Sequence, residues 1–253
     1  TALNITEQEA DLHEDQKLRV RISDLVKRLI EQISFEARGS EYVDKKSGVS
    51  ARLSISALEN AISAAERRAL INKEKETQVW ISDLIGTIPS ITGKIELVYE
   101  GEQEGPYQVA MNLLDKAIRT QFVHYFPNPD SLKKKKSAQQ QAANTDNPYR
   151  PIQSWFDKGN SLNILFSSSD AEKIQQLYRV DGLHALVKKY FKHANEKEAA
   201  LLMELVLHGL AAYSLISKKT LEGRVEFKDL MGSMLNLGSS SFTEEDFDSE
   251  DFS

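Results

Sequence analysis

The segment that runs from Ser50 to Ala69 constrains the fold more than any other part of this sequence. Its apolar residues recur at intervals of three and four, which places them on one face of an α-helix. They are Ile55, Leu58, Ile62, Ala65 and Ala69. Ser50 is a suitable N-cap for this helix, and Arg52 falls in its first turn on the side of the apolar face. The segment therefore predicts a long amphipathic helix with an arginine at its entrance.

Most of the remaining chain also has a helical period, so we expect a mainly α fold with one or two short strands. The longest predicted helices cover residues 16–38, 106–125 and 195–217. The last is apolar over much of its circumference, so we expect it at the centre of the second domain. A strand remnant is expected at Val225–Phe227. Residues 127–148 contain almost nothing apolar and carry four consecutive lysines at positions 133–136, which is typical of a linker. The sequence therefore predicts helical domains at 1–128 and 148–238, a polar linker at 129–147 and an acidic disordered tail at 239–253.

Composition limits the classes of protein to which the chain can belong. A hydrophobic fraction of 40% and a charged fraction of 28% are ordinary for a soluble globular protein. No apolar run approaches the roughly 18 residues of a membrane helix, and no signal peptide pattern is present. The absence of cysteine excludes disulfides, thiolate zinc sites and cysteine nucleophiles. We therefore expect a cytoplasmic protein with no membrane contact.

The negative charge of the chain is concentrated at its C-terminal end. The net charge is −6, and residues 242–253 carry six acids and no base, so the other 241 residues sum to zero. A general nucleic-acid binder would need a basic face, and nucleic acid is therefore an unlikely partner.

The familiar enzyme motifs are missing from this sequence. The single Gly-Lys pair, Gly93-Lys94, is followed by Ile95, and Ile88 stands where a phosphate loop needs its first glycine. No Gly-x-Ser-x-Gly elbow is present, and the five histidines are scattered. We therefore predict no catalytic residue and no metal site, and we expect this chain alone not to hydrolyse nucleotide.

Three further features each have a functional and a structural interpretation. Lys133–Lys136 can contact phosphates or form a solvated linker face. Trp155 and Phe156 can form a binding patch or a core anchor. The tail carries Phe242, Phe247 and Phe252 at intervals of five among its acids. It is either a disordered solubilising segment or a docking segment that seats its aromatic side chains on a basic groove.

Arg52 is the strongest candidate for a binding residue. Its simplest role would be a surface salt bridge. The N-terminus of a helix is positive, however, and a guanidinium in the first turn adds a bidentate donor that suits a phosphate. Gly48 and Ser50, which precede Arg52 in the same loop, would complete the binding segment.

The segment Gly48-Val49-Ser50-Ala51-Arg52 resembles the lid region of MoxR-like AAA+ ATPases, a group close to the magnesium chelatase ATPase subunit. The resemblance covers nearly the whole chain, although this segment is its specific part. The other similar segments are Ile5–Ala10, Ala64–Leu70, Ile81–Leu84 and Gly93–Leu97 in the lid, and Trp155–Asn160, Gly182-Leu183 and Glu204–Leu210 in a C-terminal extension.

This resemblance implies a specific role for Arg52. It would be the sensor-2 arginine, which reaches from the lid to the terminal phosphate of the nucleotide. The assembled protein would be a homo-oligomeric ring, expected to be a hexamer, that uses ATP and Mg²⁺ to remodel an unknown client protein. The nucleotide-binding core with its phosphate loop would precede Thr1. No tight ATP binding is therefore expected of this chain alone.

Two other functions remain open from the sequence. The chain can be a non-enzymatic helical adaptor that holds a protein partner through its acidic aromatic tail or its second domain. It can also be a nucleic-acid-associated helical module that uses Lys133–Lys136, in which case its binding would depend strongly on salt.

Overall fold

The structure is a computed structural model, and it describes residues 6, 8–47, 49–50, 52–132 and 147–230. The mainly helical class is confirmed, with 61% helix and 10% strand. The helices are α2 (Glu14–Arg19), α3 (Asp24–Gly39), α4 (Arg52–Ile71), the 3₁₀ helix η1 (Ser82–Thr87), α5 (Ile88–Thr92), α6 (Tyr99–Glu104), α7 (Pro106–Phe122), α9 (Arg150–Asp157), α10 (Asp170–Tyr178), α11 (Leu183–Tyr190) and α12 (Glu196–Ala212). The strands are β1 (Val20–Arg21), β2 (Thr77–Gln78), β3 (Leu162–Leu165), β4 (Ser217–Leu221) and β5 (Arg224–Lys228).

Helix α4 confirms the amphipathic pattern from which its position was predicted. Of the predicted face, Leu58, Ile62, Ala65 and Ala69 are buried, while Ile55 is half-buried. The helix packs on α3 and on η1. One polar contact fixes the crossing with α3, because the hydroxyls of Ser34 and Ser54 lie 2.7 Å apart in the buried interface.

The predicted helix over residues 16–38 is wrong, because the chain leaves the helical conformation between α2 and α3. Val20 and Arg21 form β1, which pairs in parallel with β2. Ser23 then caps α3, its hydroxyl accepting the Val26 N–H at 3.3 Å. The Ser23-Asp24 pair is an ordinary N-cap signal, but the periodic apolar residues on both sides of it concealed the break. The end of α3 at Gly39 agrees with the prediction.

The prolines of the first half mark helix entrances. Pro89 lies in the first turn of α5, where its fixed φ is favourable. Pro106 occupies the first turn of α7, as predicted. Between these helices an isolated bridge pairs Val43 with Leu97, which holds the loop before α4 against the segment before α6.

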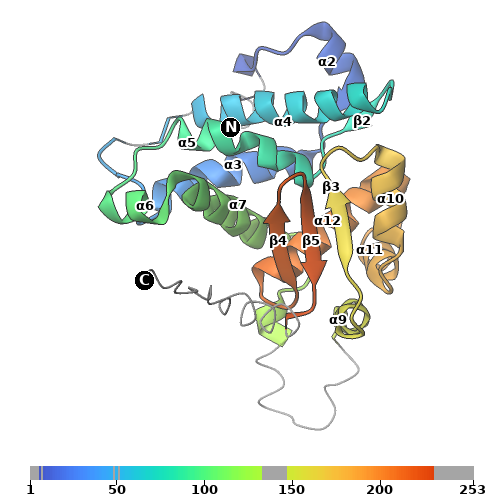
Figure 1. Cartoon of the computed structure of the whole chain (residues 1–253). Coiled ribbons are helices and arrows are strands. Elements are labelled where there is room, and N and C mark those ends of the chain that lie inside the picture. The colour runs from blue at the N-terminus through green and yellow to red at the C-terminus, as the bar shows by residue number, and fades with distance from the viewer. Residues whose placement is uncertain (1–5, 7, 48, 51, 133–146, 231–253) are drawn as a thin grey trace, which may run out of the picture.

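The second half places α12 behind a small sheet (Figure 1). The sheet is antiparallel with the order β3-β5-β4, so five strands are described where one or two were expected. Every residue of α12 from Ala199 to Leu210 is buried, which confirms the predicted central position. Ser169 caps α10 in a capping box with Glu172.

None of the helices among the described residues combines the length and apolarity needed to cross a membrane.

The two predicted domain ranges share one hydrophobic core. Helix α7 belongs to the first range, and it packs both on α3 of that range and on α12 of the second. At the second contact, the Phe122 ring lies directly over Gly209. The predicted linker between these ranges falls largely on residues 133–146, outside the described residues, and the division into two domains stays a prediction. Within the described parts, the apolar cluster is continuous from Val20 to Phe227.

Candidate functional site

The structure places Ser50 and Arg52 at the N-terminus of α4, as the sequence predicted. Arg52 is the first residue of this helix of 20 residues, and its backbone N–H donates to the Ser50 hydroxyl at 3.2 Å. The side chain of Arg52 is exposed, and it makes no ion pair with the residues that the structure describes. Gly48, the third predicted residue of this segment, lies outside the described residues. The described residues therefore include no partner for the surface salt bridge that was the simplest role of Arg52.

A cavity of about 370 Å³ opens beside the N-terminus of α4. It is lined by Ser47, Val49, Ser50 and the segment Gly93–Glu96, and Arg52 is not among the lining residues. The Ser47 hydroxyl donates to the carboxylates of Glu96 and Asp44, which ties the loop before α4 to the segment that carries Lys94. Lys94 and the positive end of α4 favour an anion at this edge, whereas Glu96 opposes one.

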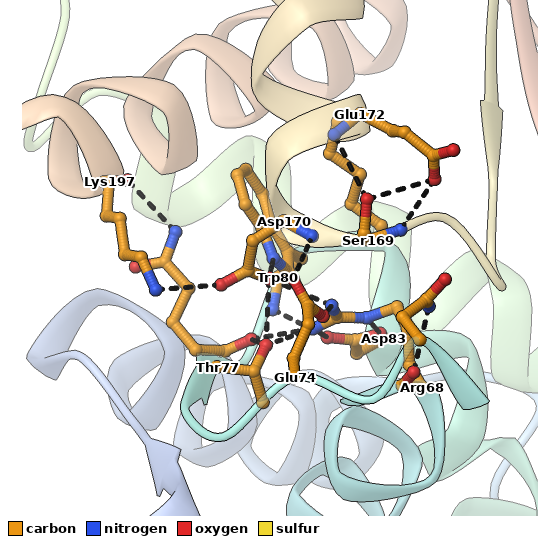
Figure 2. Close-up of polar contacts among 12 residues, drawn as sticks. Arg68, Glu74, Thr77, Trp80, Asp83, Ser169, Asp170, Glu172 and Lys197 are labelled. Atoms are coloured by element: carbon orange, nitrogen blue, oxygen red, sulfur yellow. Dashed lines mark hydrogen bonds and ion pairs between the residues drawn. The ribbon is translucent and has the colours of Figure 1, made fainter. Parts of the chain in front are cut away.

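A buried polar network at the other end of α4 was not predicted as a site. Arg68 comes from the last turns of α4, Asp83 from η1 and Asp170 from α10, and Figure 2 shows their side chains converging. The Arg68 guanidinium donates to Asp83 at 3.2 and 3.1 Å and to Asp170 at 2.9 Å. It also donates to the Thr77 hydroxyl and to the Gln78 carbonyl, both at 2.9 Å. All three guanidinium nitrogens therefore donate to at least one acceptor, although Arg68 is only 2% exposed.

Asp170 is the acceptor on which this network converges. One carboxylate oxygen accepts from Arg68, from Trp80 Nε1 at 2.8 Å and from the Thr77 hydroxyl at 2.8 Å. The other accepts from Lys197 Nζ at 3.0 Å. Burial raises the pKa of Asp170, but the hydrogen bonds from Trp80 and Thr77 and the charge of Arg68 outweigh burial and leave this pKa below that of an ordinary aspartate. Asp170 is therefore held as a carboxylate.

A second buried polar cluster, formed by Lys173, Ser82 and Glu204, lies next to the Arg68 network. Lys173 on α10 donates to the Ser82 hydroxyl at 2.6 Å. On α12, the Glu204 carboxylate accepts the N–H groups of Ile81 and Ser82 at 2.8 and 3.1 Å, at the start of η1. Burial lowers the pKa of Lys173 and raises that of Glu204. A serine paired with a lysine can act as a nucleophile. Ser82 is only 2% exposed, and it borders a cavity of about 360 Å³ that Arg68 and Asp83 also line.

The buried network joins segments that are far apart in the sequence. Arg68 and Asp170 are separated by 102 residues, and Ile81 and Glu204 by 123. Every charged group in it faces a counter-charge or a hydrogen-bond partner, as buried charges require. The arrangement therefore fastens α4 and η1 to α10 and α12.

One signal for this network was present in the sequence. Arg68 lies three residues after Ala65 and one before Ala69, so it falls on the buried face of α4. A charge on the apolar face of a helix indicates a buried counter-charge. Arg68 also lies in the last turn of α4, where a cation is favourable for the helix dipole alone, so its position did not by itself predict a buried partner. Because Asp170 is 102 residues away, no local pattern pointed to it.

The remaining candidates can be placed briefly. Phe156 is fully buried and Trp155 nearly so, and their rings meet edge to face at 4.9 Å, which confirms the core-anchor interpretation. Lys133–Lys136 and the tail phenylalanines lie outside the described residues. Within the described ranges, no group of three or more His, Asp or Glu side chains is disposed to hold a metal ion.

Comparison of the chain with protein-family models, with curated proteins and with solved structures found no match. Any assignment of function therefore rests on the sequence and on the geometry described above.

Proposed function

We propose that this chain is the lid and C-terminal extension of a MoxR-like AAA+ ATPase, an ATP-driven remodelling ring, and that Arg52 is its sensor-2 arginine. The observation that carries the proposal is the position of Arg52. It is exposed, it begins a helix of 20 residues, and it forms no ion pair with a described residue. An arginine in this position can meet a phosphate without first breaking another contact.

The other side of the site would come from outside these residues. A nucleotide-binding core upstream of Thr1 would supply the phosphate loop and the Mg²⁺ ligands, and Arg52 would reach the terminal phosphate of ATP from the lid. One isolated arginine gives little affinity without the backbone cradle, the lysine and the metal. In the assembled protein, which we propose is a cytoplasmic homo-oligomeric ring, the partners are that core, the neighbouring subunits and an unidentified client.

The structure of α4 supports a coupling role for this helix. Arg52 and Arg68 are 16 residues apart, which corresponds to about 24 Å along the helix axis at 1.5 Å per residue. The near end of α4 would sense the phosphate. The far end is fastened to α10 through the Arg68–Asp170 ion pair. A rotation of the lid on hydrolysis would therefore move the second half of the chain.

The first test is the coding sequence immediately upstream of Thr1, where a phosphate loop followed by an acidic strand is expected. The second test is the ATPase rate of the chain joined to that core. We expect Arg52→Ala to lower kcat at least tenfold, which corresponds to about 1.4 kcal/mol of lost transition-state stabilisation. Arg179→Ala is the matched control, because Arg179 is also exposed but lies at the C-terminal end of α10.

The control should keep its rate within twofold. An unchanged rate for Arg52→Ala, with the control equally active, would overturn the sensor role. Absence of a phosphate loop upstream would overturn the family assignment itself.

A further inference from the structure

A largely apolar groove of about 510 Å³ lies where the start of α3, the end of α7 and the turn between α11 and α12 meet. Its apolar lining consists of Leu25, Tyr125, Tyr190, Phe191, Leu201 and Leu202. The rings of Tyr125 and Phe191 are 6.2 Å apart, and Tyr190 is 38% exposed. The groove therefore offers aromatic and aliphatic surface to a ligand with apolar side chains.

The rim of this groove is basic. Lys192 and His193 line it directly, and Lys188 and Lys189 lie in the preceding turn of α11. Burial raises the pKa of the Tyr125 hydroxyl, and two charges on α3 also act on this pKa: Arg28 lowers it and Asp24 raises it. Among the residues that line the groove, the one acid is Glu198, whose carboxylate accepts the Asn195 N–H. Lysine and arginine therefore outnumber carboxylates around the groove.

The chain itself contains a segment whose chemistry complements this groove. Residues 242–253 carry six acids, no base and three phenylalanines spaced five apart. The described chain ends at Leu230, close to β4, because Lys228 pairs with Ser217. Eleven residues separate Leu230 from Phe242, and an extended chain of that length spans about 36 Å.

The groove lies within this span. Lys218, next to Ser217 on β4, forms an ion pair with Asp115 in the middle of α7. Tyr125 in the groove is ten residues further along, or about 15 Å at the helical rise. Together with the width of the Lys218–Asp115 pair, this path is comparable to the length of the connecting segment, so the tail can reach the groove.

We propose that residues 242–253 dock in this groove of their own chain, with phenylalanine rings in the apolar channel and carboxylates on the basic rim. The contact is independent of the proposed ATPase role. The acids steer the segment and set its position, while the rings supply the buried apolar surface. Docking is therefore expected to weaken at high salt and to require the phenylalanines.

Disulfide trapping in the full chain tests this proposal, because the sequence contains no cysteine and an introduced pair has no competitor. The test pair is His193→Cys with Ser249→Cys, which joins the groove to the tail and keeps all its acids and rings. The control pair is Tyr107→Cys with Ser249→Cys. Tyr107 is 55% exposed and lies eight residues from Asp115 on the opposite side from the groove, about 12 Å along α7. An undocked tail would reach it as readily.

We expect the test pair to form an intramolecular disulfide at least tenfold faster than the control pair in low salt. The preference should disappear when Phe242, Phe247 and Phe252 are all replaced by serine, and it should shrink in 0.5 M salt, where the Debye length is only a few ångströms. Equal rates for the two pairs, or a preference that survives the serine variant, would overturn the proposal. Covalent dimers in place of the internal disulfide would assign the groove to the tail of a second copy and overturn docking within one chain.

Discussion

Arg68 and His208 are both buried, but among the described residues only the Arg68 side chain has hydrogen-bond partners. The Arg68 guanidinium donates to two carboxylates, a hydroxyl and a carbonyl. The two ring nitrogens of His208 have no hydrogen-bond partner among the described residues, and the ring packs edge-on against Phe227 at 5.1 Å. Removing the first side chain leaves counter-charges behind, whereas removing the second leaves nothing unsatisfied.

Replacement of Arg68 by Met should be strongly destabilising. It removes the cation that the buried carboxylates of Asp83 and Asp170 share and leaves Asp170 with Lys197 alone. Loss of one partner of a buried ion pair typically costs about 3–5 kcal/mol of unfolding free energy. Denaturant unfolding of Arg68→Met, Asp170→Asn and the double variant measures the coupling. We expect the double variant to lose less than the sum of the single losses, by roughly 0.5–3 kcal/mol. Additive losses would show that the two side chains do not depend on each other.

His208 should make stability depend on pH. Burial, with the charges of Lys218 and Lys173, lowers its pKa well below the ordinary 6.5. Below pH 6.5 the unfolded chain therefore binds a proton that the folded chain does not. Stability is retained above that pH and is lost as the pH falls, by up to about 1.4 kcal/mol per pH unit.

His208→Leu should abolish this contribution and should also raise stability at pH 7.5 by about 1 kcal/mol, because two buried unpaired nitrogens are removed. Urea unfolding between pH 5 and pH 7.5 measures both effects. His124→Gln is the control, because that exposed side chain remains in water in both states. The same pH slope in wild type and in His208→Leu would contradict the prediction.

At the scale of elements, several boundaries follow from local signals and others do not. Pro106, Ser169 and Asn195 each mark a helix start in the sequence, and α7, α10 and α12 begin beside them. Such caps depend on residues within one turn. The β1–β2 pair that interrupts the predicted first helix joins residues 57 positions apart, Val20 and Thr77. Local periodicity therefore could not reveal it.

The crossing of α7 and α12 depends on the absence of a side chain at Gly209. A Cβ built there would lie 2.2 Å from a ring carbon of Phe122. Gly209→Ala gains roughly 1 kcal/mol of helix propensity, but the clash in a filled core typically costs about 1–3 kcal/mol or more. We therefore expect a net loss of stability in thermal or denaturant unfolding, partly relieved by Phe122→Leu.

Gly39→Ala is the matched control for this prediction. Gly39 is also helical, but a Cβ there meets nothing within 4 Å. It should leave stability unchanged or slightly increased. A stabilising effect of Gly209→Ala as large as that of the control would show that the two helices separate without cost.

At the scale of the whole molecule, the continuous core and the buried network tie the two predicted domain ranges together. Trp80 lies in the first range and Trp155 in the second, and both are buried. We expect one cooperative unfolding transition. Fluorescence of Trp155→Phe, which reports on Trp80 alone, should give the same midpoint as far-ultraviolet circular dichroism of that variant. Separate midpoints would indicate two independently stable domains.

The sequence by itself determined the mainly helical class, the long face of α4, the central position of α12 and the placement of Arg52 at a helix entrance. Each of these depends on apolar period or on capping residues within a few positions. Tertiary structure alone decided the strand pairings, the partners of Arg68, the close packing of Phe122 on Gly209 and the groove between α3, α7 and α11. Arg68 and Asp170, for example, are 102 residues apart. Their energies come from burial and from matched charges, which no local pattern in the chain records.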